Sequence, residues 1–236
     1  MIKTVIFDID DTLYDFWAVD TAGKERVRDY AAANCGVDGD LFLETVLEMA
    51  RFQFRVHPDV SCCHSRVIRA QLACEKLGLP IHYALGLADA YWSAFLETIT
   101  PYDGIPELFD DLRARGMRIG IGTNMVADLQ IKKLVRLGLA DKCDFMVSSE
   151  EADAEKPAPA FFAVCIDKAG CAPGECLFIG DNPKVDTKGA MDAGMQALLF
   201  AHAGIPEGYD MPAVVSAGEV IPYIDRHLPF RGARLA

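Results

Sequence analysis

Three carboxylates occupy four consecutive positions in the stretch VIFDIDDTL at residues 5–13, directly after an apolar run. Asp8, Asp10 and Asp11 repel one another at this spacing, and a crowded or buried carboxylate is costly unless a cation compensates its charge. A magnesium ion would do so, because Mg²⁺ prefers hard oxygen ligands and few protein carboxylates. Asp8, together with Asp181 from a later acidic cluster, would supply those carboxylates.

Three further polar clusters follow predicted strands in the same way as the first. They lie at residues 122–124, 155–157 and 180–186. In open α/β sheets ligands bind outside the carboxyl ends of the strands, so the fold would bring all four clusters to one edge. Each cluster alone is a weak signal, because a solvated turn or a helix start produces a similar pattern. Four clusters in this arrangement indicate one active site.

The elements that would position these clusters alternate along the chain. Five apolar runs rich in β-branched residues are typical of buried parallel strands: 4–7, 118–121, 144–147, 176–179 and 196–200. Helical periodicity predicts the helices between them: 105–116, 126–138, 157–170 and 183–194. This alternation predicts an α/β fold with a doubly wound parallel sheet and helices on both faces.

The stretch from about residue 16 to residue 100 breaks this alternation and contains no convincing strand. It has four helical segments instead, at roughly 19–34, 40–55, 62–77 and 81–98. The aromatic residues of the last segment are interpreted as the core of a helical bundle. The sequence therefore predicts a Rossmann-like α/β core of residues 1–15 and 101–236, with an inserted all-helical domain of residues 16–100. The tail 231–236 is expected to fray.

Composition restricts the partners of the protein. The formal charge of −12 argues against nucleic acid, which recruits Lys and Arg, but a metal and one or two cations can still accommodate a small phosphorylated substrate. No apolar run reaches membrane-spanning length, and the N-terminus is too short and too acidic for a signal peptide, so a cytoplasmic protein is expected. Cys62-Cys63-His64 has no second spaced pair, and packing is favoured there over zinc.

Nearly the whole chain resembles the haloacid dehalogenase-like hydrolase superfamily. The ordered motifs that carry the resemblance are DxDxT at Asp8–Thr12, Thr123, Lys156 in a KPxP context, and GDxxxxD at Gly180–Asp186. The helical stretch after the first motif looks like the helical (C1-type) cap of the family. The resemblance implies the phosphatase branch, with Mg²⁺ held by Asp8, by the backbone carbonyl of Asp10 and by Asp181.

The resemblance also implies a role for each motif. With its repulsion from phosphate neutralised, Asp8 can attack phosphorus in line and form an aspartyl-phosphate. The Thr123 hydroxyl and Lys156, with backbone amides near Asn124, would hold the transferred oxygens. The Asn124 side chain is equally suited to capping the next helix. Asp186 is expected to orient Lys156 or a metal-bound water.

Asp10 decides the reaction class. Two residues after the nucleophile, it can protonate the leaving alkoxide and then deprotonate the water that hydrolyses the intermediate. By resemblance the dehalogenase branch has no acid at this position, because halide leaves without a proton. Asp10 therefore indicates phosphate-ester chemistry. In an extended segment Asp11 has the opposite parity to Asp8 and Asp10, so it is expected to point away from the phosphate in a turn-forming role.

The substrate is less sharply defined. Tyr14, Phe16 and Trp17 follow the first motif closely enough either to stack on a base or sugar, or to anchor the hinge between core and cap. The expected substrate is a small phosphate ester, with a nucleoside 5′-monophosphate favoured over a sugar phosphate. A phosphomutase with Lys24 as its cap residue and a non-catalytic phosphate-binding protein are the alternatives. Both a monomer and a homodimer are compatible with the sequence.

Overall fold

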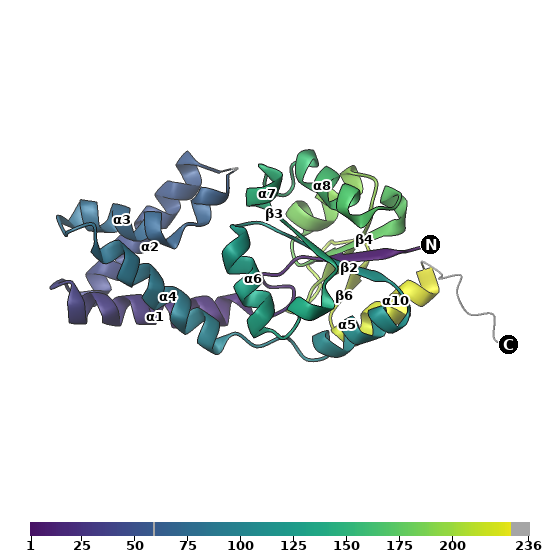
Figure 1. Ribbon diagram of the computed structural model, residues 1–236, viewed down its shortest axis with the longest axis horizontal. Coiled ribbons are helices and arrows are strands. Elements are labelled where there is room, and N and C mark those ends of the chain that lie inside the picture. The colour runs from purple at the N-terminus through teal and green to yellow at the C-terminus, as the bar shows by residue number, and fades with distance from the viewer. Residues whose placement is uncertain (59, 228–236) are drawn as a thin grey trace. The chain divides into compact units, whose positions relative to one another are not determined.

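The computed structural model describes residues 1–58 and 60–227 of the chain, which divide into two compact units (Figure 1). One unit contains Met1–Asp15 and the chain from Thr100 onward, and the other contains Phe16–Ile99. The sequence predicts the corresponding boundaries after residues 15 and 100. The tail 231–236, which was expected to fray, lies outside the described residues.

A parallel sheet of six strands forms the centre of the first unit. Its strands are β1 (Thr4–Phe7), β2 (Arg118–Thr123), β3 (Phe145–Ser148), β4 (Cys176–Gly180), β5 (Gln196–Phe200) and β6 (Ala213–Val214). Their order is β3-β2-β1-β4-β5-β6, and every pair is parallel. The predicted parallel α/β sheet is thus confirmed. Strand β6 was missed, because two residues are too few to show a periodic pattern.

Strand β1 lies at the switch point of this sheet. Phe7 pairs with Ile121 of β2 on one side and with Ile179 of β4 on the other. Strands β2 and β3 are thus added on one side of β1, and β4 to β6 on the other. Ligands of open α/β sheets bind in the crevice at the carboxyl end of such a switch-point strand. Asp8 is the residue that follows β1 at this point.

Helices cover both faces of the sheet (Figure 1). They are α5 (Ile105–Ala114), α6 (Ala127–Arg136), α7 (Ser149–Ala152), α8 (Pro159–Ala169), α9 (Lys188–Asp192) and α10 (Val220–His227). Phe7 stacks on Phe109 of α5 at 4.8 Å between ring centroids, whereas the adjacent Ile6 belongs to a buried cluster with Phe161 and Phe162 of α8. Successive side chains of a strand point to opposite faces, so β1 needs apolar residues at every position.

The structure corrects the start of one predicted helix and the type of another. The helix predicted from Pro157 begins at Pro159, because a residue before proline is disfavoured in the helical region and Ala158 is extended, with φ −58° and ψ 134°. The helix predicted from Pro183 is a π-helical turn, Pro183–Thr187, which continues as α9.

The buried face of α6 also differs from the predicted one. The apolar pattern predicted a face of Val126, Leu129, Leu134 and Leu137. Of these, Leu134 and the C-cap residue Leu137 are buried, and the other buried residues of the helix are Gln130 and Lys133. Gln130 and Lys133 are thus two buried polar side chains at positions that the apolar pattern did not include, and they belong to the site described below.

Among its described residues, the second unit contains helices and their connections but no strand. Its helices are α1 (Phe16–Asn34), α2 (Gly39–Val56), α3 (Arg66–Leu77) and α4 (Tyr83–Thr98), with a 3₁₀ turn at Ser61–His64. Tyr91 and Phe95 of α4 are buried, which confirms their interpretation as bundle core. Cys63 is buried as well, as the packing interpretation requires.

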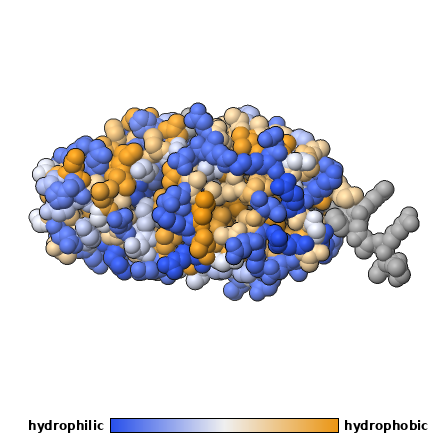
Figure 2. Space-filling view, in the orientation of Figure 1, coloured by the Kyte–Doolittle hydropathy of each residue, from blue (hydrophilic) through white to orange (hydrophobic). Residues whose placement is uncertain are grey.

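The surface drawn in Figure 2 is mixed in polarity. Hydrophilic residues cover much of this face, and hydrophobic residues gather over α6, where Ile131 and Val135 are exposed. Within residues 1–58 and 60–227, no helix combines the length and the apolar character needed to cross a membrane.

Candidate active site

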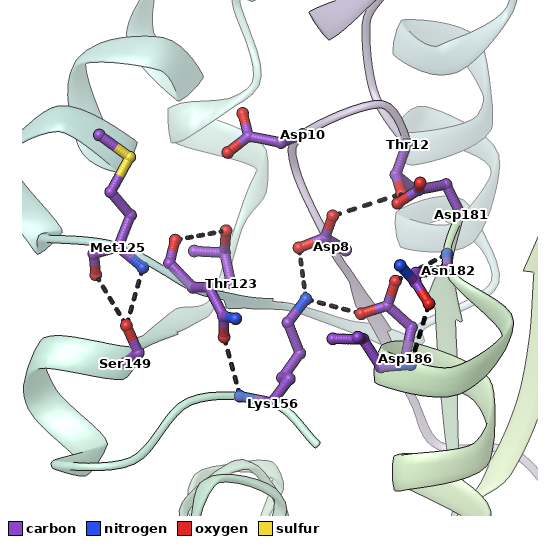
Figure 3. A network of polar contacts seen from close by, with 12 residues as sticks. Asp8, Asp10, Thr12, Thr123, Met125, Ser149, Lys156, Asp181, Asn182 and Asp186 are labelled. Carbon is purple, nitrogen blue, oxygen red and sulfur yellow. Dashed lines mark hydrogen bonds and ion pairs between the residues drawn. The ribbon is translucent and has the colours of Figure 1, made fainter. Parts of the chain in front are cut away.

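Asp8 lies at the carboxyl end of β1 and is almost fully buried. Its backbone N–H donates to the Ile179 carbonyl at 2.9 Å, which extends the pairing with β4 and fixes the direction of the side chain. Its Oδ1 lies 2.5 Å from the Nζ of Lys156 (Figure 3). Burial raises the pKa of Asp8 to about 7, although the Lys156 charge acts to lower it.

Lys156 joins two carboxylates that follow different strands, Asp8 after β1 and Asp186 after β4. Its buried ammonium donates to Asp8 Oδ1 and, at 2.7 Å, to Asp186 Oδ1. Burial disfavours the charged form, but Asp186 and Asp8 together hold the pKa of Lys156 above its ordinary value. The other oxygen of Asp186 accepts the backbone N–H of Asn182 at 3.0 Å. Asp186 is thus in position to orient Lys156.

Asp181 completes a group of three carboxylates with Asp8 and Asp186. Each of the three offers an oxygen within 4.8 Å of the others. The Thr12 hydroxyl lies between two of them, 3.4 Å from Asp181 Oδ1 and 3.5 Å from Asp8 Oδ2. Burial, followed by the neighbouring Asp8 charge, raises the pKa of Asp181 to about 8. Three acids grouped in this way could hold a metal ion.

Gly180 allows this group to form. A Cβ at this position would lie 2.5 Å from the Asp186 carboxyl group. The end of β4 therefore requires glycine, and it is the absence of a side chain that lets Asp186 reach Lys156.

The Asp10 carboxylate does not join this group. It points away from Asp8 and Lys156 in Figure 3, and its Oδ1 lies 2.6 Å from Lys133 Nζ. Tyr14 also donates its hydroxyl to Oδ1, and the Gln130 amide donates to Oδ2 at 3.3 Å. Burial acts to raise the pKa of Asp10, but the Lys133 charge and the side-chain hydrogen bonds to the carboxylate together outweigh it and hold the pKa below its usual value.

The parity argument for Asp10 and Asp11 is wrong, because the segment turns after β1. The Leu13 N–H donates to the Ile9 carbonyl at 3.0 Å, and Asp11 has a φ of 62° in the left-handed region. Its carboxylate accepts the Tyr102 hydroxyl at 3.3 Å. The turn-forming role predicted for Asp11 is confirmed, but the reason is backbone conformation and not strand alternation.

Thr123 is the last residue of β2, and Asn124 follows it in a tight loop. The buried Thr123 hydroxyl accepts the Gln130 amide at 2.6 Å. Met125 has a φ of 102°, and its N–H donates to Ser149 Oγ at 2.8 Å, which secures the loop (Figure 3). A methionine rarely adopts this backbone region without such support.

The Asn124 side chain does not cap α6. Its Oδ1 accepts the Lys156 backbone N–H at 2.9 Å, and its amide donates to Glu155 at 3.4 Å. The N–H of Ala127, at the start of α6, donates instead to Glu150 at 2.9 Å. The capping alternative is therefore wrong. Asn124 instead binds the backbone of Lys156, whose ammonium contacts Asp8.

The three aromatic candidates lie in different surroundings. Tyr14 is fully buried, so its ring has no open face for a substrate to stack on, and that expectation is corrected: its hydroxyl binds Asp10. Phe16 and Trp17 begin the helical unit, where their rings contact each other at 5.3 Å and Phe16 contacts Phe95 at 6.0 Å. Trp17 is 65% exposed. Substrate contact by Phe16 and Trp17 stays a prediction.

Two residues of this site, Gln130 and Lys133, were missed. Both are fully buried on α6, and both bind Asp10. The sequence signal that could have identified this site was Lys133, a charged residue next to the apolar Leu134 on the inward face of α6. Buried lysines are rare unless they are paired, so this position could have been identified as one that requires a carboxylate partner.

Comparison with known proteins gives consistent matches. A family model described as haloacid dehalogenase-like hydrolase matches residues 2–194. The chain is 34% identical over 204 residues to a ribulose-1,5-bisphosphate 5-phosphatase of Halopiger xanaduensis, covering 85% of each protein. It is 31% identical over 201 residues to a glyceraldehyde 3-phosphate phosphatase of Methanothermobacter thermautotrophicus, covering 84% of this chain and 85% of the other.

Solved structures match over nearly the full length. A 2-haloacid dehalogenase from Pseudomonas syringae has a TM-score of 0.77 at 26% identity, covering 96% of this chain and 99% of the other. A HAD phosphatase from Thermococcus onnurineus has a TM-score of 0.75 at 25% identity, covering 94% and 98%.

Proposed function

The chain belongs to the haloacid dehalogenase-like hydrolases, and we propose that it is a Mg²⁺-dependent phosphatase that hydrolyses small sugar phosphates through an aspartyl-phosphate. The observation that carries this proposal is the contact of Lys156 with both Asp8 and Asp186 beside Asp181. These contacts bring three parts of the proposed chemistry to the carboxyl end of β1: a nucleophile, a cation for phosphate oxygens, and a group of acids for the metal.

The acids of this site fit a magnesium ion. Asp8, Asp181 and Asp186 offer hard carboxylate oxygens within 4.8 Å of one another, and the raised pKa values of Asp8 and Asp181 reflect an excess of buried negative charge. Asp186 has both oxygens engaged, by Lys156 and by the Asn182 N–H. Asp8 and Asp181 would therefore hold the ion, with the Asp10 backbone carbonyl as predicted. Bound Mg²⁺ would offset the repulsion between the phosphate and Asp8.

Two displacements at phosphorus complete the proposed reaction. An Asp8 carboxylate oxygen attacks the phosphorus in line, and the bond to the ester oxygen breaks. The negative charge of the bound phosphate favours the protonated form of Asp10, which supplies the proton that the leaving alkoxide takes up. Lys156 and the Thr123 hydroxyl hold the equatorial oxygens. Asp10 then takes a proton from water, which attacks the phosphorus and breaks its bond to Asp8. The products are the alcohol and inorganic phosphate.

Sugar phosphates are the substrate class that the relatives favour. The two relatives compared above, which match more than four-fifths of the chain, carry the names of phosphatases for a pentulose bisphosphate and a triose phosphate. This moves the preference away from the nucleoside 5′-monophosphate expected from the sequence, which stays in the test as a second class. The cytoplasm as location and a monomeric or homodimeric state also stay predictions.

A dehalogenase and a phosphomutase are less well supported alternatives. The fold is shared with a 2-haloacid dehalogenase, but a C–Cl cleaving enzyme needs no acid at Asp10, and here that carboxylate has three side-chain donors. Lys24, the candidate for a phosphomutase, is engaged in an ion pair with the buried Asp20 at 2.5 Å.

The test is a panel of phosphate esters scored by kcat/KM with Mg²⁺ present. Triose, pentose and pentulose phosphates form one group, nucleoside 5′-monophosphates a second, and 2-chloropropionate reports dehalogenation. Highest activity on the first group supports the proposal. Chloride release without phosphate release would refute it.

A further inference from the structure

We propose that Lys133 and Gln130 of α6 are positioning residues, which hold the Asp10 carboxylate in the place from which it serves the leaving oxygen. This inference rests on the proposed phosphatase reaction and extends it to a helix that contributes none of the recognised motifs. It accounts for two buried polar side chains that the packing of α6 does not require.

The Asp10 carboxylate is held at both oxygens. Lys133 Nζ lies 2.6 Å from Oδ1, Tyr14 donates to the same oxygen, and the Gln130 amide lies 3.3 Å from Oδ2. The Asp10 side chain is still 30% exposed, whereas that of Lys133 is fully buried. The carboxylate is thus fixed from the side of α6 and open on another side, as a group that must meet a substrate has to be.

Packing alone does not explain why the buried side chains at positions 130 and 133 are polar. Lys133 brings an ammonium into the interior, where its desolvation is costly unless a carboxylate pairs with it. The Gln130 amide nitrogen lies within hydrogen-bond distance of Asp10, Thr123 Oγ1 and the Asn124 carbonyl, but its Oε1 accepts no hydrogen bond from the described residues. Apolar side chains at these positions would bury surface without such costs, so their polar character serves the site.

Gln130 also connects the two halves of the proposed chemistry. It binds both Asp10, the proton carrier, and Thr123, a ligand of the phosphate oxygens. The distance between these two groups is therefore set by one rigid helix. Lys156 performs a separate task, since its contacts are with Asp8 and Asp186. Each of the two buried lysines thus serves a different carboxylate of the first motif.

The dependence of the rate on the leaving group tests this role. Phenyl phosphate and p-nitrophenyl phosphate differ by one nitro group, but p-nitrophenolate leaves readily without a proton, whereas phenolate benefits from protonation. In Lys133→Met we expect kcat for phenyl phosphate to fall at least about tenfold more than kcat for p-nitrophenyl phosphate. Lys132→Met is the matched control, because Lys132 is the exposed neighbour that pairs with Asp128 on the outside of α6.

A purely structural role gives a different result. If Lys133→Met lowers kcat for both esters by the same factor, or changes neither, the positioning proposal is wrong. If Lys133→Met does not fold, as judged by its melting curve, Gln130→Met carries the same test, because it leaves the Lys133–Asp10 ion pair in place. A wild-type protein that hydrolyses neither ester with Mg²⁺ would instead overturn the proposed function itself, and this inference with it.

Discussion

The Lys156 ammonium lies 2.5 Å from the Asp8 carboxylate, and both groups are buried. This ion pair joins the end of β1 to a loop contributed by a distant part of the chain. Lys156 also reaches Asp186 in the turn after β4, so a single cation ties three segments of the site together. Substituting Asp8 should therefore mainly affect the chemistry, and substituting Lys156 should also affect the stability.

Asp8→Asn should abolish phosphatase activity without unfolding the protein. Loss of the nucleophile is expected to lower kcat by at least about 10³-fold, because no other group can form the covalent intermediate. The pKa of Asp8 is raised to about 7 by burial, so its charge is already disfavoured and a neutral amide should not lower the melting temperature. The control is Asp192→Asn, at an exposed acid paired with Lys188 on α9. Near-normal turnover of p-nitrophenyl phosphate by Asp8→Asn would exclude Asp8 as the nucleophile.

Lys156→Met should destabilise the protein in a pH-dependent way. It leaves Asp8 and Asp186 buried without their cation, which is expected to cost about 3–5 kcal/mol at pH 8. The loss should shrink toward pH 5.5, because the Asp8 carboxyl group, whose pKa is about 7, is then protonated and no longer needs the ammonium. Urea unfolding at the two pH values measures it, with Lys132→Met as the control. An equal loss at both pH values would show that the ion pairs contribute little.

Mg²⁺ should stabilise the protein more at pH 8.5 than at pH 6. The folded pKa values of Asp8 and Asp181, about 7 and about 8, lie above the ordinary value of 3.8. The metal-free folded state therefore binds more protons than the unfolded state between these limits, and its stability falls as pH rises through them. Mg²⁺ replaces those protons and restores stability at high pH. Melting curves with Mg²⁺ and with EDTA test this, and activity that persists in EDTA would contradict the metal dependence.

Asp11→Asn should cost far less activity than Asp10→Asn. Asp11 has a φ of 62°, a conformation that asparagine tolerates well, and its carboxylate contacts Tyr102. Asp10→Asn removes the proton carrier and is expected to lower kcat by about 10²–10⁴-fold on an alkyl ester. Equal losses in the two variants would mean that the roles in the first motif are assigned incorrectly.

Gly180→Ala should weaken both stability and activity. The added Cβ would lie 2.5 Å from the Asp186 carboxyl group, and relief of this contact is expected to cost about 1–3 kcal/mol and to displace Asp186 from Lys156. Gly174→Ala is the control, since a Cβ there meets no atom within 4 Å and its backbone is not left-handed. Urea unfolding and kcat together measure the effect, and a Gly180→Ala protein that behaves like Gly174→Ala would contradict this account.

The sequence predicts the frame of this molecule better than the directions of its side chains. Five strands and the acids that follow them carry local signals, because apolar runs and turn residues mark where each strand ends. The direction of Asp10 depends on Lys133, a residue far along the chain, and no local pattern contains that contact. The target of Asn124 was missed for the same reason, since its partner is the backbone of Lys156. In both cases the direction of the side chain is set by a polar contact with a residue distant in the sequence.

The central position of β1 has a consequence for biosynthesis. Thr4 pairs with Arg118 on one side and with Cys176 on the other, so both neighbours of this strand are made after the entire helical unit. While the chain emerges from the ribosome, the apolar strand that carries the nucleophile has no strand to pair with. Such non-local pairing folds slowly and exposes an aggregation-prone segment. The helical unit, built from local contacts, can fold first, whereas β1 can pair only after β2 has been made.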